Sequence, residues 1–386
     1  MKKIFLFVLL FILNMIVLPK YVLAENIDIA KHSESAILIE ATTQKILYEK
    51  ESKKEMAPAS MTKLMTLLLT MEAIEKGQLN ISEEVLISKR AQDMGGTQIY
   101  IESGSLVKVE DLIKGVGIAS ANDAAVALAE KIGGTVENFV DMMNKRALEL
   151  GCKNTNFKNP HGLDEEGHYS SAYDMALIAS ELVKYDYALK ISSTYDEHIN
   201  VSGENHWLVN TNKLIKFYKG IDGLKTGYTD KAGYCLTATM NKNNMRLISV
   251  VMKSDTKDNR SSDTIAMMEY GYSMYGSETI LKMNEFEGKI QINNSEKREY
   301  DYKLENDVKV IVDKNTKDIN YSTNIELLKT LKAPIHKGEK IGILTLNYDN
   351  KEYKYNIILK EEVKKANYLK IFRNHLKDLI TGTVRK

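Results

Sequence analysis

Three short motifs, in a fixed order along the chain, carry the residues that could do chemistry. Ser60 and Lys63 lie three positions apart at the predicted start of a helix, so they share one helix face. Lys63 can therefore take a proton from the Ser60 hydroxyl. The positive field of a helix N-terminus favours both a neutral lysine and a developing oxyanion. This pair predicts a serine nucleophile that works without a histidine.

The Ser-x-x-Lys pattern is not specific by itself. It recurs at Ser105 and Ser254, and a serine at a helix start is often only an N-cap. Only Ser60 opens a long pattern that is apolar all round, over residues 61–76, which predicts a buried central helix. The surrounding sequence therefore selects Ser60.

The other two motifs supply a hydroxyl, an amide and a cation. Ser120-Ala121-Asn122 lies in a predicted loop between two helices, and Lys225-Thr226-Gly227 precedes two predicted strands. Either motif alone is typical of a turn or a helix cap, and Ser322-Thr323-Asn324 matches the first pattern too. In this order, on a helix start, an interhelical loop and a strand, the three motifs predict one acyl-transfer site.

Other chemistries find little support in the sequence. The seven histidines include no His-x-x-x-His pair for a metal. No Gly-x-Ser-x-Gly elbow and no phosphate-binding glycine loop occurs. We therefore expect no metal and no cofactor. His161 and His168 fall in a polar loop and are predicted to make hydrogen bonds there.

The first 24 residues have the pattern of a secretory signal peptide: a basic start, an apolar run from Ile4 to Leu18 and small residues before Glu25. The alternative is an uncleaved membrane anchor, but a spanning helix needs about 20 apolar residues.

Cleavage removes three lysines and no acid, so 53 basic and 52 acidic residues become 50 and 52. The resulting net charge of −2 gives no global attraction to nucleic acid.

The mature chain is too long for one typical domain, so two domains are expected. The composition changes near residue 280, which places the predicted boundary there. From there to about residue 360, short Val, Ile, Leu and Tyr runs alternate with turn residues, and this predicts a small all-β domain. The two cysteines, Cys152 and Cys235, are too few for a disulfide framework. They are predicted to be buried thiols.

The elements that must position the motifs can be predicted from periodicity. Residues 35–50 are predicted to form a hairpin, and strands at 234–240 and 246–253 to join it in one antiparallel sheet. Helices are predicted at 61–76, twice within 109–134, and at 136–150, 171–184 and 260–275. Ser120 to Asp123 is expected to cap the second helix of the 109–134 pair.

The C-terminal segment has the pattern of an amphipathic helix. Its apolar residues recur at helical spacing: Leu369, Phe372, Leu376, Leu379 and Ile380. Basic residues interleave them: Lys364, Lys365, Lys370, Arg373 and Lys377. The segment is too charged to span a bilayer, and it is predicted to lie on a membrane surface. The alternative is a helix docked on its own domain.

These motifs and their surroundings resemble the low-molecular-mass penicillin-binding proteins, the serine-type D-alanyl-D-alanine carboxypeptidases. The resemblance runs from about Ser35 to the C-terminus. It is densest at residues 57–63, 95–97, 120–124, 159–163, 222–229 and 232–235. One departure is Ala121, where many members carry glycine; both residues are small.

The resemblance implies an α+β fold of the serine β-lactamase and penicillin-binding type, with helices packed on an antiparallel sheet. It implies four parts: a signal peptide (1–24), a transpeptidase-like catalytic domain (25–278), a small all-β domain (279–360) and an amphipathic membrane-anchoring helix (361–386). The mature protein would then be exported and held peripherally at the outer face of the cytoplasmic membrane.

The resemblance also implies roles in removing the terminal D-alanine from peptidoglycan stem pentapeptides. Ser60 attacks the carbonyl between the last two D-alanines, Lys63 accepts its proton, and Ser120 relays a proton to the leaving amine. Asn122 holds the peptide and helps to position Lys63. β-Lactam antibiotics are expected to bind as inhibitors.

The remaining implied site residues bind substrate. Lys225, Thr226 and Arg260 face the terminal carboxylate, next to Gly227 and Tyr228. The backbone N–H groups of Ser60 and Tyr228 form the implied oxyanion hole.

Three alternatives remain open at this point. A β-lactamase would need a further carboxylate, and Glu165 and Glu166 lack the Glu-x-x-Leu-Asn pattern around them. A DD-endopeptidase on the same fold would carry the same motifs. A catalytically silent peptidoglycan-binding protein is disfavoured by the intact motif residues.

Overall fold

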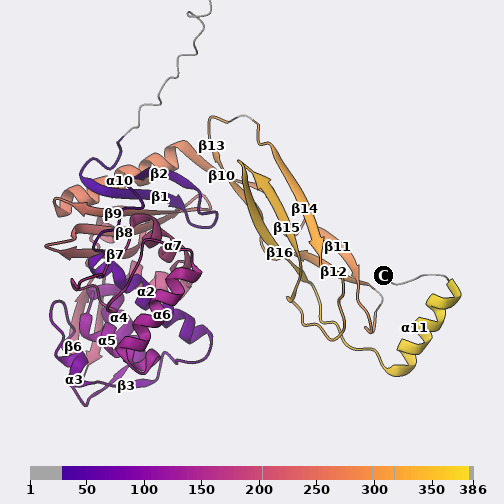
Figure 1. The fold of residues 1–386 in the computed structure, drawn as a ribbon, viewed down its shortest axis with the longest axis horizontal. Helices are drawn as coiled ribbons and strands as arrows, with labels where there is room; N and C mark the ends of the chain where they lie inside the picture. The colour runs from indigo at the N-terminus through magenta and orange to yellow at the C-terminus, as the bar shows by residue number, and fades with distance from the viewer. Residues whose placement is uncertain (1–27, 202, 298, 317, 382–386) are drawn as a thin grey trace, which may run out of the picture.

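The computed structural model describes residues 28–201, 203–297, 299–316 and 318–381, so the predicted signal peptide lies outside the described residues. Figure 1 shows two parts: one in which helices surround a sheet, and a β-rich part with helix α11 (Tyr368–Thr381) at its far end.

A five-stranded antiparallel sheet, in the order β2-β1-β9-β8-β7, forms the centre of the first part. Its strands are β1 (Ser33–Glu40), β2 (Ile46–Lys50), β7 (Ile221–Thr229), β8 (Gly233–Lys242) and β9 (Met245–Ser254). The predicted hairpin and its union with the later strands are confirmed. β7, which carries Lys225, lies at one edge of this sheet.

Helices cover both faces of the sheet. Because successive residues of a strand point to opposite sides, β1 contributes side chains to a core on each face. Ile37 and Ile39 belong to the core that contains α2 (Lys63–Glu75) and α7 (Ala172–Leu182). Leu38 packs instead with Met267 and Met268 of α10 (Lys257–Met274). A strand buried on both faces therefore appears in the sequence as an unbroken apolar run.

The central helix α2 is buried along its length from Lys63 to Ala73, as its sequence predicts. It begins two residues later than expected because residues 59–62 form a 3₁₀ turn, η1 (Ala59–Thr62). The neighbouring helices are α3 (Lys89–Gln92), α4 (Val109–Lys114), α5 (Asn122–Gly133), α6 (Val136–Glu149), α8 (Asp186–Ser193) and α9 (Leu214–Phe217). Two small hairpins complete this part: β3 (Glu84–Leu86) with β4 (Leu106–Lys108), and β5 (Asp196–Val201) with β6 (Glu204–Val209).

The predicted side-chain cap of α5 is wrong. The helix begins at Asn122, and its N-cap, Ala121, makes no side-chain hydrogen bond. Ser120 ends a π-helical turn, η2 (Gly115–Ala119), in the left-handed region at φ 68°. The Asn122 side chain does not cap the helix because it bonds to Lys63 and Gly95.

The C-terminal part is all-β, as predicted. β10 (Tyr275–Leu281) pairs with β13 (Val308–Asp313). The second sheet has the order β11-β12-β16-β15-β14, with β11 (Glu287–Gln291), β12 (Glu299–Leu304), β14 (Tyr321–Leu327), β15 (Lys340–Tyr348) and β16 (Lys351–Leu359). Lys45 Nζ contacts both sheets from the β1–β2 turn: it donates to the Ile311 carbonyl and to Asp349, each at 3.0 Å.

The C-terminal segment forms a helix, as predicted, but α11 begins at Tyr368 and not at residue 361, because Val363 and Lys365 form bridges to the β-rich part. Leu369, Phe372, Leu376 and Ile380 are exposed, which disagrees with docking of this stripe on its own domain. The side chains of Lys377 and Leu379 lie outside the described residues. Within the segments that the structure describes, none of the helices is long and apolar enough to cross a membrane. Both cysteines are buried and free, as predicted.

Candidate active site

Ser60 and Lys63 meet at the junction of η1 and α2. Lys63 Nζ lies 3.1 Å from Ser60 Oγ, 2.6 Å from Asn122 Oδ1 and 2.7 Å from the carbonyl oxygen of His161. Ser60 is not the N-cap of α2, because Thr62 occupies that position. The structure therefore brings the first two motifs into direct contact through Lys63.

The environment of Lys63 favours its neutral amine. Burial lowers the pKa of Lys63 well below its usual 10.5, and the charge of Lys225 lowers this pKa further, while Asp123 opposes the shift. The side chain is fully buried. A neutral amine is the form that can accept a proton from the Ser60 hydroxyl.

The first turn of α5 is held by the segment at residues 95–101. Asn122 Nδ2 donates to the Gly95 carbonyl at 2.7 Å. The buried Asp123 carboxylate accepts the Ile99 N–H at 3.1 Å. Gly96 has φ +77°, and a Cβ there would lie 2.7 Å from Asn122 Nδ2. Only glycine allows this segment to approach Asn122 so closely.

A loop at residues 158–168 packs against η1, the turn that carries Ser60. Thr62 Oγ1 lies 2.8 Å from His168 Nε2, and His168 Nδ1 accepts the Lys158 N–H at 3.0 Å. Because Nδ1 accepts, Nε2 carries the proton and donates to Thr62. His161 Nδ1 accepts the Leu163 N–H at 3.2 Å. The predicted loop hydrogen bonds of both histidines are confirmed.

Gly162 lets this loop approach the backbone of η1 closely. Its φ is +89°, and a Cβ there would lie 1.9 Å from the Ala59 carbonyl oxygen. Sequence reasoning assigned Gly162 no function. The available signal was its place in the segment 159–163, where the resemblance to the family is dense.

Two buried basic side chains, Lys225 of the third motif and Arg260, lie close enough for the charge of Arg260 to act on Lys225. Lys225 Nζ donates to the Thr226 carbonyl at 3.0 Å. Burial, followed by the charge of Arg260, lowers the pKa of Lys225 from 10.5 to about 7. Arg260 lies on α10, and its buried Nε has no hydrogen-bond partner among the described residues. Such a pair of cations favours an anion between them.

A cleft of about 610 Å³ joins the three motifs. Its lining includes Ser60, Ser120, Thr226, Gly227, Tyr228 and Arg260. Lys63, Asn122 and Lys225 are buried and do not form part of this lining. Val209 and Thr211 form a further wall, and Thr226 Oγ1 donates to Thr211 Oγ1 at 2.7 Å. Sequence reasoning missed this wall, which has no recognisable motif.

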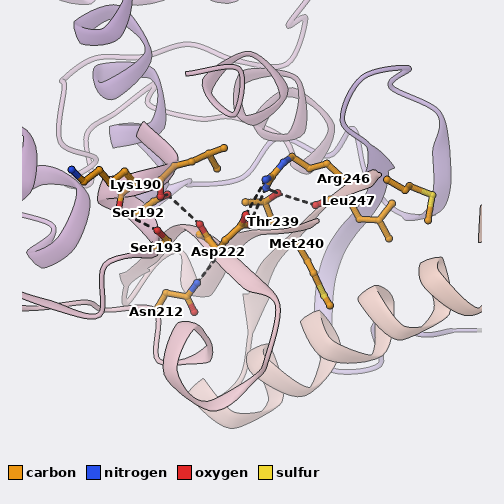
Figure 2. A network of polar contacts seen from close by, with 12 residues as sticks. Lys190, Ser192, Ser193, Asn212, Asp222, Thr239, Met240, Arg246 and Leu247 are labelled. Carbon is orange, nitrogen blue, oxygen red and sulfur yellow. Dashed lines mark hydrogen bonds and ion pairs between the residues drawn. The ribbon is translucent and has the colours of Figure 1, made fainter. Parts of the chain in front are cut away.

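Figure 2 shows how the start of β7 is held in place. Arg246 of β9 forms a bidentate ion pair with Asp222, with Nη1–Oδ1 and Nη2–Oδ2 distances of 2.9 Å. Asn212 Nδ2 donates to the Gly223 carbonyl at 3.0 Å. The strand is therefore tied to β9 three residues before Lys225, and to the loop that follows β6 two residues before it.

The chain matches two family models: "D-alanyl-D-alanine carboxypeptidase" over residues 22–256, and "Penicillin-binding protein 5, C-terminal domain" over residues 275–365. The first match covers more than half of the chain. The chain belongs to the D-alanyl-D-alanine carboxypeptidase family.

Known members of the D-alanyl-D-alanine carboxypeptidase family align along most of the chain. D-alanyl-D-alanine carboxypeptidase DacF of Bacillus subtilis (strain 168) is 42% identical over 353 residues, 91% of each chain. The structure of penicillin binding protein 5 from Haemophilus influenzae has a TM-score of 0.67 and 31% identity, over 86% of this chain and 98% of that chain. Penicillin-Binding Protein D2 from Listeria monocytogenes, in an ampicillin-bound form, has a TM-score of 0.57 and 31% identity over 62% of this chain and 98% of its own. The predicted family, fold and serine-peptidase class are confirmed.

Proposed function

We propose that this protein removes the terminal D-alanine from peptidoglycan stem pentapeptides through an acyl-enzyme on Ser60. The observation that carries the proposal is the contact of one buried lysine, Lys63, with both Ser60 and Asn122. Family membership supports the substrate class, since the relatives are D-alanyl-D-alanine carboxypeptidases.

In the proposed mechanism, Ser60 Oγ attacks the carbonyl between the two D-alanines while Lys63 takes the hydroxyl proton. The backbone N–H groups of Ser60 and Tyr228 bind the developing oxyanion, a contribution of roughly 3–4 kcal/mol for each donor. Ser120 relays a proton to the leaving amine as the C–N bond breaks. Water then hydrolyses the Ser60 ester, which releases the shortened peptide and restores the hydroxyl.

Lys225, Thr226 and Arg260 would bind the terminal carboxylate of the substrate, while Asn122 and Gly227 hold the peptide. The carboxylate raises the pKa of Lys225 from about 7, because it favours the charged ammonium. Substrate binding therefore takes up a proton at pH values slightly above 7.

A pentapeptide substrate tests this function. Mass spectrometry should show loss of one D-alanine with the wild-type protein and none with Ser60→Ala. A substrate with an amidated C-terminus should lose most of its kcat/KM with the wild type and much less with Lys225→Ala, because the carboxylate and Lys225 act as a pair. Equal losses in both proteins would place carboxylate recognition elsewhere, with Arg260 the first candidate.

The β-lactamase alternative lacks support in the cleft. Glu165 accepts a hydrogen bond from Asn159 Nδ2 at 3.0 Å, and neither Glu165 nor Glu166 belongs to the described lining of the cleft. β-Lactams are therefore proposed as inhibitors that acylate Ser60, in line with the ampicillin-bound Listeria relative.

We also propose that α11 holds the exported protein peripherally at the outer face of the cytoplasmic membrane. The exposed Leu369, Phe372, Leu376 and Ile380 would enter the interface. Each basic residue near anionic lipid contributes about 1 kcal/mol. Deletion of residues 368–386, which begins at the first residue of α11, should leave an active protein that no longer sediments with anionic liposomes. Equal sedimentation of the truncated and full chains would contradict the proposal.

A further inference from the structure

The β5–β6 hairpin presents an exposed aromatic pair. His198 and Trp207 lie directly opposite each other in the register, with ring centroids 6.4 Å apart and planes 20° apart. Trp207 Nε1 donates to Asp196 Oδ2 at 3.0 Å. The Trp207 residue is nevertheless 62% exposed. Its polar edge is therefore satisfied, while much of the indole ring remains available for a ligand.

This pair lies on a surface that continues into the active-site cleft. Val209, two residues after Trp207, shares its face of the strand and lines the cleft beside Ser60. The two residues are about 7 Å apart along the strand. The opposite face of the hairpin is anchored by the buried Ile199 and Leu208, which fixes the aromatic pair outward. In Figure 1, β6 lies on the same side of the molecule as β7, below it.

The hairpin wall belongs to the end of the cleft that would hold the leaving residue. Thr211 accepts a hydrogen bond from Thr226, and Asn212 bonds to the backbone just before Lys225. This step rests on the proposed function, in which Thr226 and Lys225 bind the carboxylate of the leaving D-residue. Trp207 is not among the residues that line the cleft, so a leaving D-alanine, which has only a methyl side chain, would not need the indole for its binding.

We infer that Trp207 and His198 form a subsite for a larger leaving residue, namely the second stem peptide of cross-linked peptidoglycan. In that substrate the leaving amine belongs to a diamino acid, whose methylene chain continues into the second stem. Methylene groups that cross an indole face gain apolar burial. The chemistry is the same: the amide C–N bond breaks, the amine takes the proton, and water then cleaves the Ser60 ester.

A pair of substrates separates this subsite from the rest of the site. The experiment measures kcat/KM of the full mature protein for a pentapeptide and for a cross-linked dimer of two stem peptides. Trp207→Ala should lower the dimer-to-pentapeptide ratio of kcat/KM about tenfold, mainly through KM, and Trp207→Phe should restore part of it. Tyr321→Ala removes another exposed strand aromatic, on β14, and should leave the ratio unchanged.

Fluorescence gives an independent readout, because Trp207 is the only tryptophan in the sequence. In Ser60→Ala protein, the dimer should change the emission more than the pentapeptide does at equal occupancy. A ratio that is unchanged in Trp207→Ala would overturn the subsite. So would a wild type that cleaves the pentapeptide but not the dimer, and this result would leave the proposed function standing. A wild type that cleaves neither substrate would contradict the proposed function itself.

Discussion

Lys63 Nζ lies closer to Asn122 Oδ1, at 2.6 Å, than to Ser60 Oγ, at 3.1 Å. A neutral amine has two N–H groups and one lone pair. The Asn122 oxygen and the His161 carbonyl, which is 2.7 Å away, can each accept one N–H. The lone pair is then left for the Ser60 hydroxyl. In the proposed mechanism, this pair of acceptors orients Lys63 as the base.

Lys63→Arg should abolish acylation and preserve the fold, because a guanidinium keeps its proton in a protein. In the wild type, the acylation rate should fall as the pH drops through a lysine pKa that lies below 10.5. Stopped-flow measurement of acylation against pH tests both points. Lys76→Arg, at the exposed end of the same helix, should behave as wild type. Substantial acylation by Lys63→Arg at neutral pH would show that Lys63 is not the base.

The Asp222–Arg246 pair should position β7 as well as stabilise it. Its side chains are 31% and 17% exposed, against 70% and 51% for the Glu137–Arg90 pair. A double-mutant cycle on stability, with Asp222→Asn and Arg246→Gln, should give a coupling of about 1–2 kcal/mol. The same cycle on Glu137 and Arg90 should give a clearly smaller coupling, because solvent screens this exposed pair.

The positioning role predicts an effect on the third motif. The Asp222→Asn protein should lose kcat/KM for a free C-terminal carboxylate more than for an amidated substrate, because Lys225 is displaced. An equal loss of kcat/KM for both substrates would show that the Asp222–Arg246 pair only stabilises the fold and does not position Lys225.

Gly162→Ala should distort η1, the turn that carries Ser60. The added Cβ would lie 1.9 Å from the Ala59 carbonyl oxygen, so one of the two backbones must move. Gly151→Ala is the matched control, since its φ is +83° and a Cβ there has nothing within 4 Å. Both variants should lose about 1 kcal/mol of stability, because alanine is strained in the left-handed conformation. Only Gly162→Ala should also slow acylation by more than tenfold. Similar acylation rates in the two variants would argue against this contact.

How far the sequence leads depends on whether a feature is local. The sheet and α2 are predictable because their apolar patterns extend over whole elements. The way α5 begins is not predictable from its local sequence. The Asn122 side chain bonds to Lys63 on another helix, so it does not cap α5. The Asp222–Arg246 pair joins residues on strands that are not neighbours in the sheet. Nothing in the local sequence around either residue signals that partner.

The motif residues show the same limit. Ser60 and Lys63 are adjacent because a helix places them so, and this follows from their spacing. The contact of Lys63 with Asn122 needs the tertiary fold, and the sequence predicts it only through the order of the motifs and the resemblance to the family. The Gly162 contact depends on the path of a loop, for which periodicity gives no information.

Acid should destabilise the protein through His168. Burial lowers its pKa from 6.5 to about 4, so the unfolded chain takes up the proton first as the pH falls. The contribution of neutral His168 to the free energy of unfolding is fully present above about pH 6.5. It is lost as the pH falls from about 6.5 to about 4. The loss from pH 7.5 to pH 5 should be about 2 kcal/mol. Urea titrations followed by Trp207 emission should show a smaller loss in His168→Gln. An unchanged loss of stability in His168→Gln would contradict this account.

Intact-mass analysis of the protein after reaction with penicillin tests the assignment of the nucleophile most directly. The wild type should gain the mass of one penicillin, and peptide mapping should place it on Ser60. Ser60→Ala should gain none. An adduct on Ser105 or Ser254, or an unchanged adduct in Ser60→Ala, would contradict the assignment of Ser60 and with it the site described around Lys63.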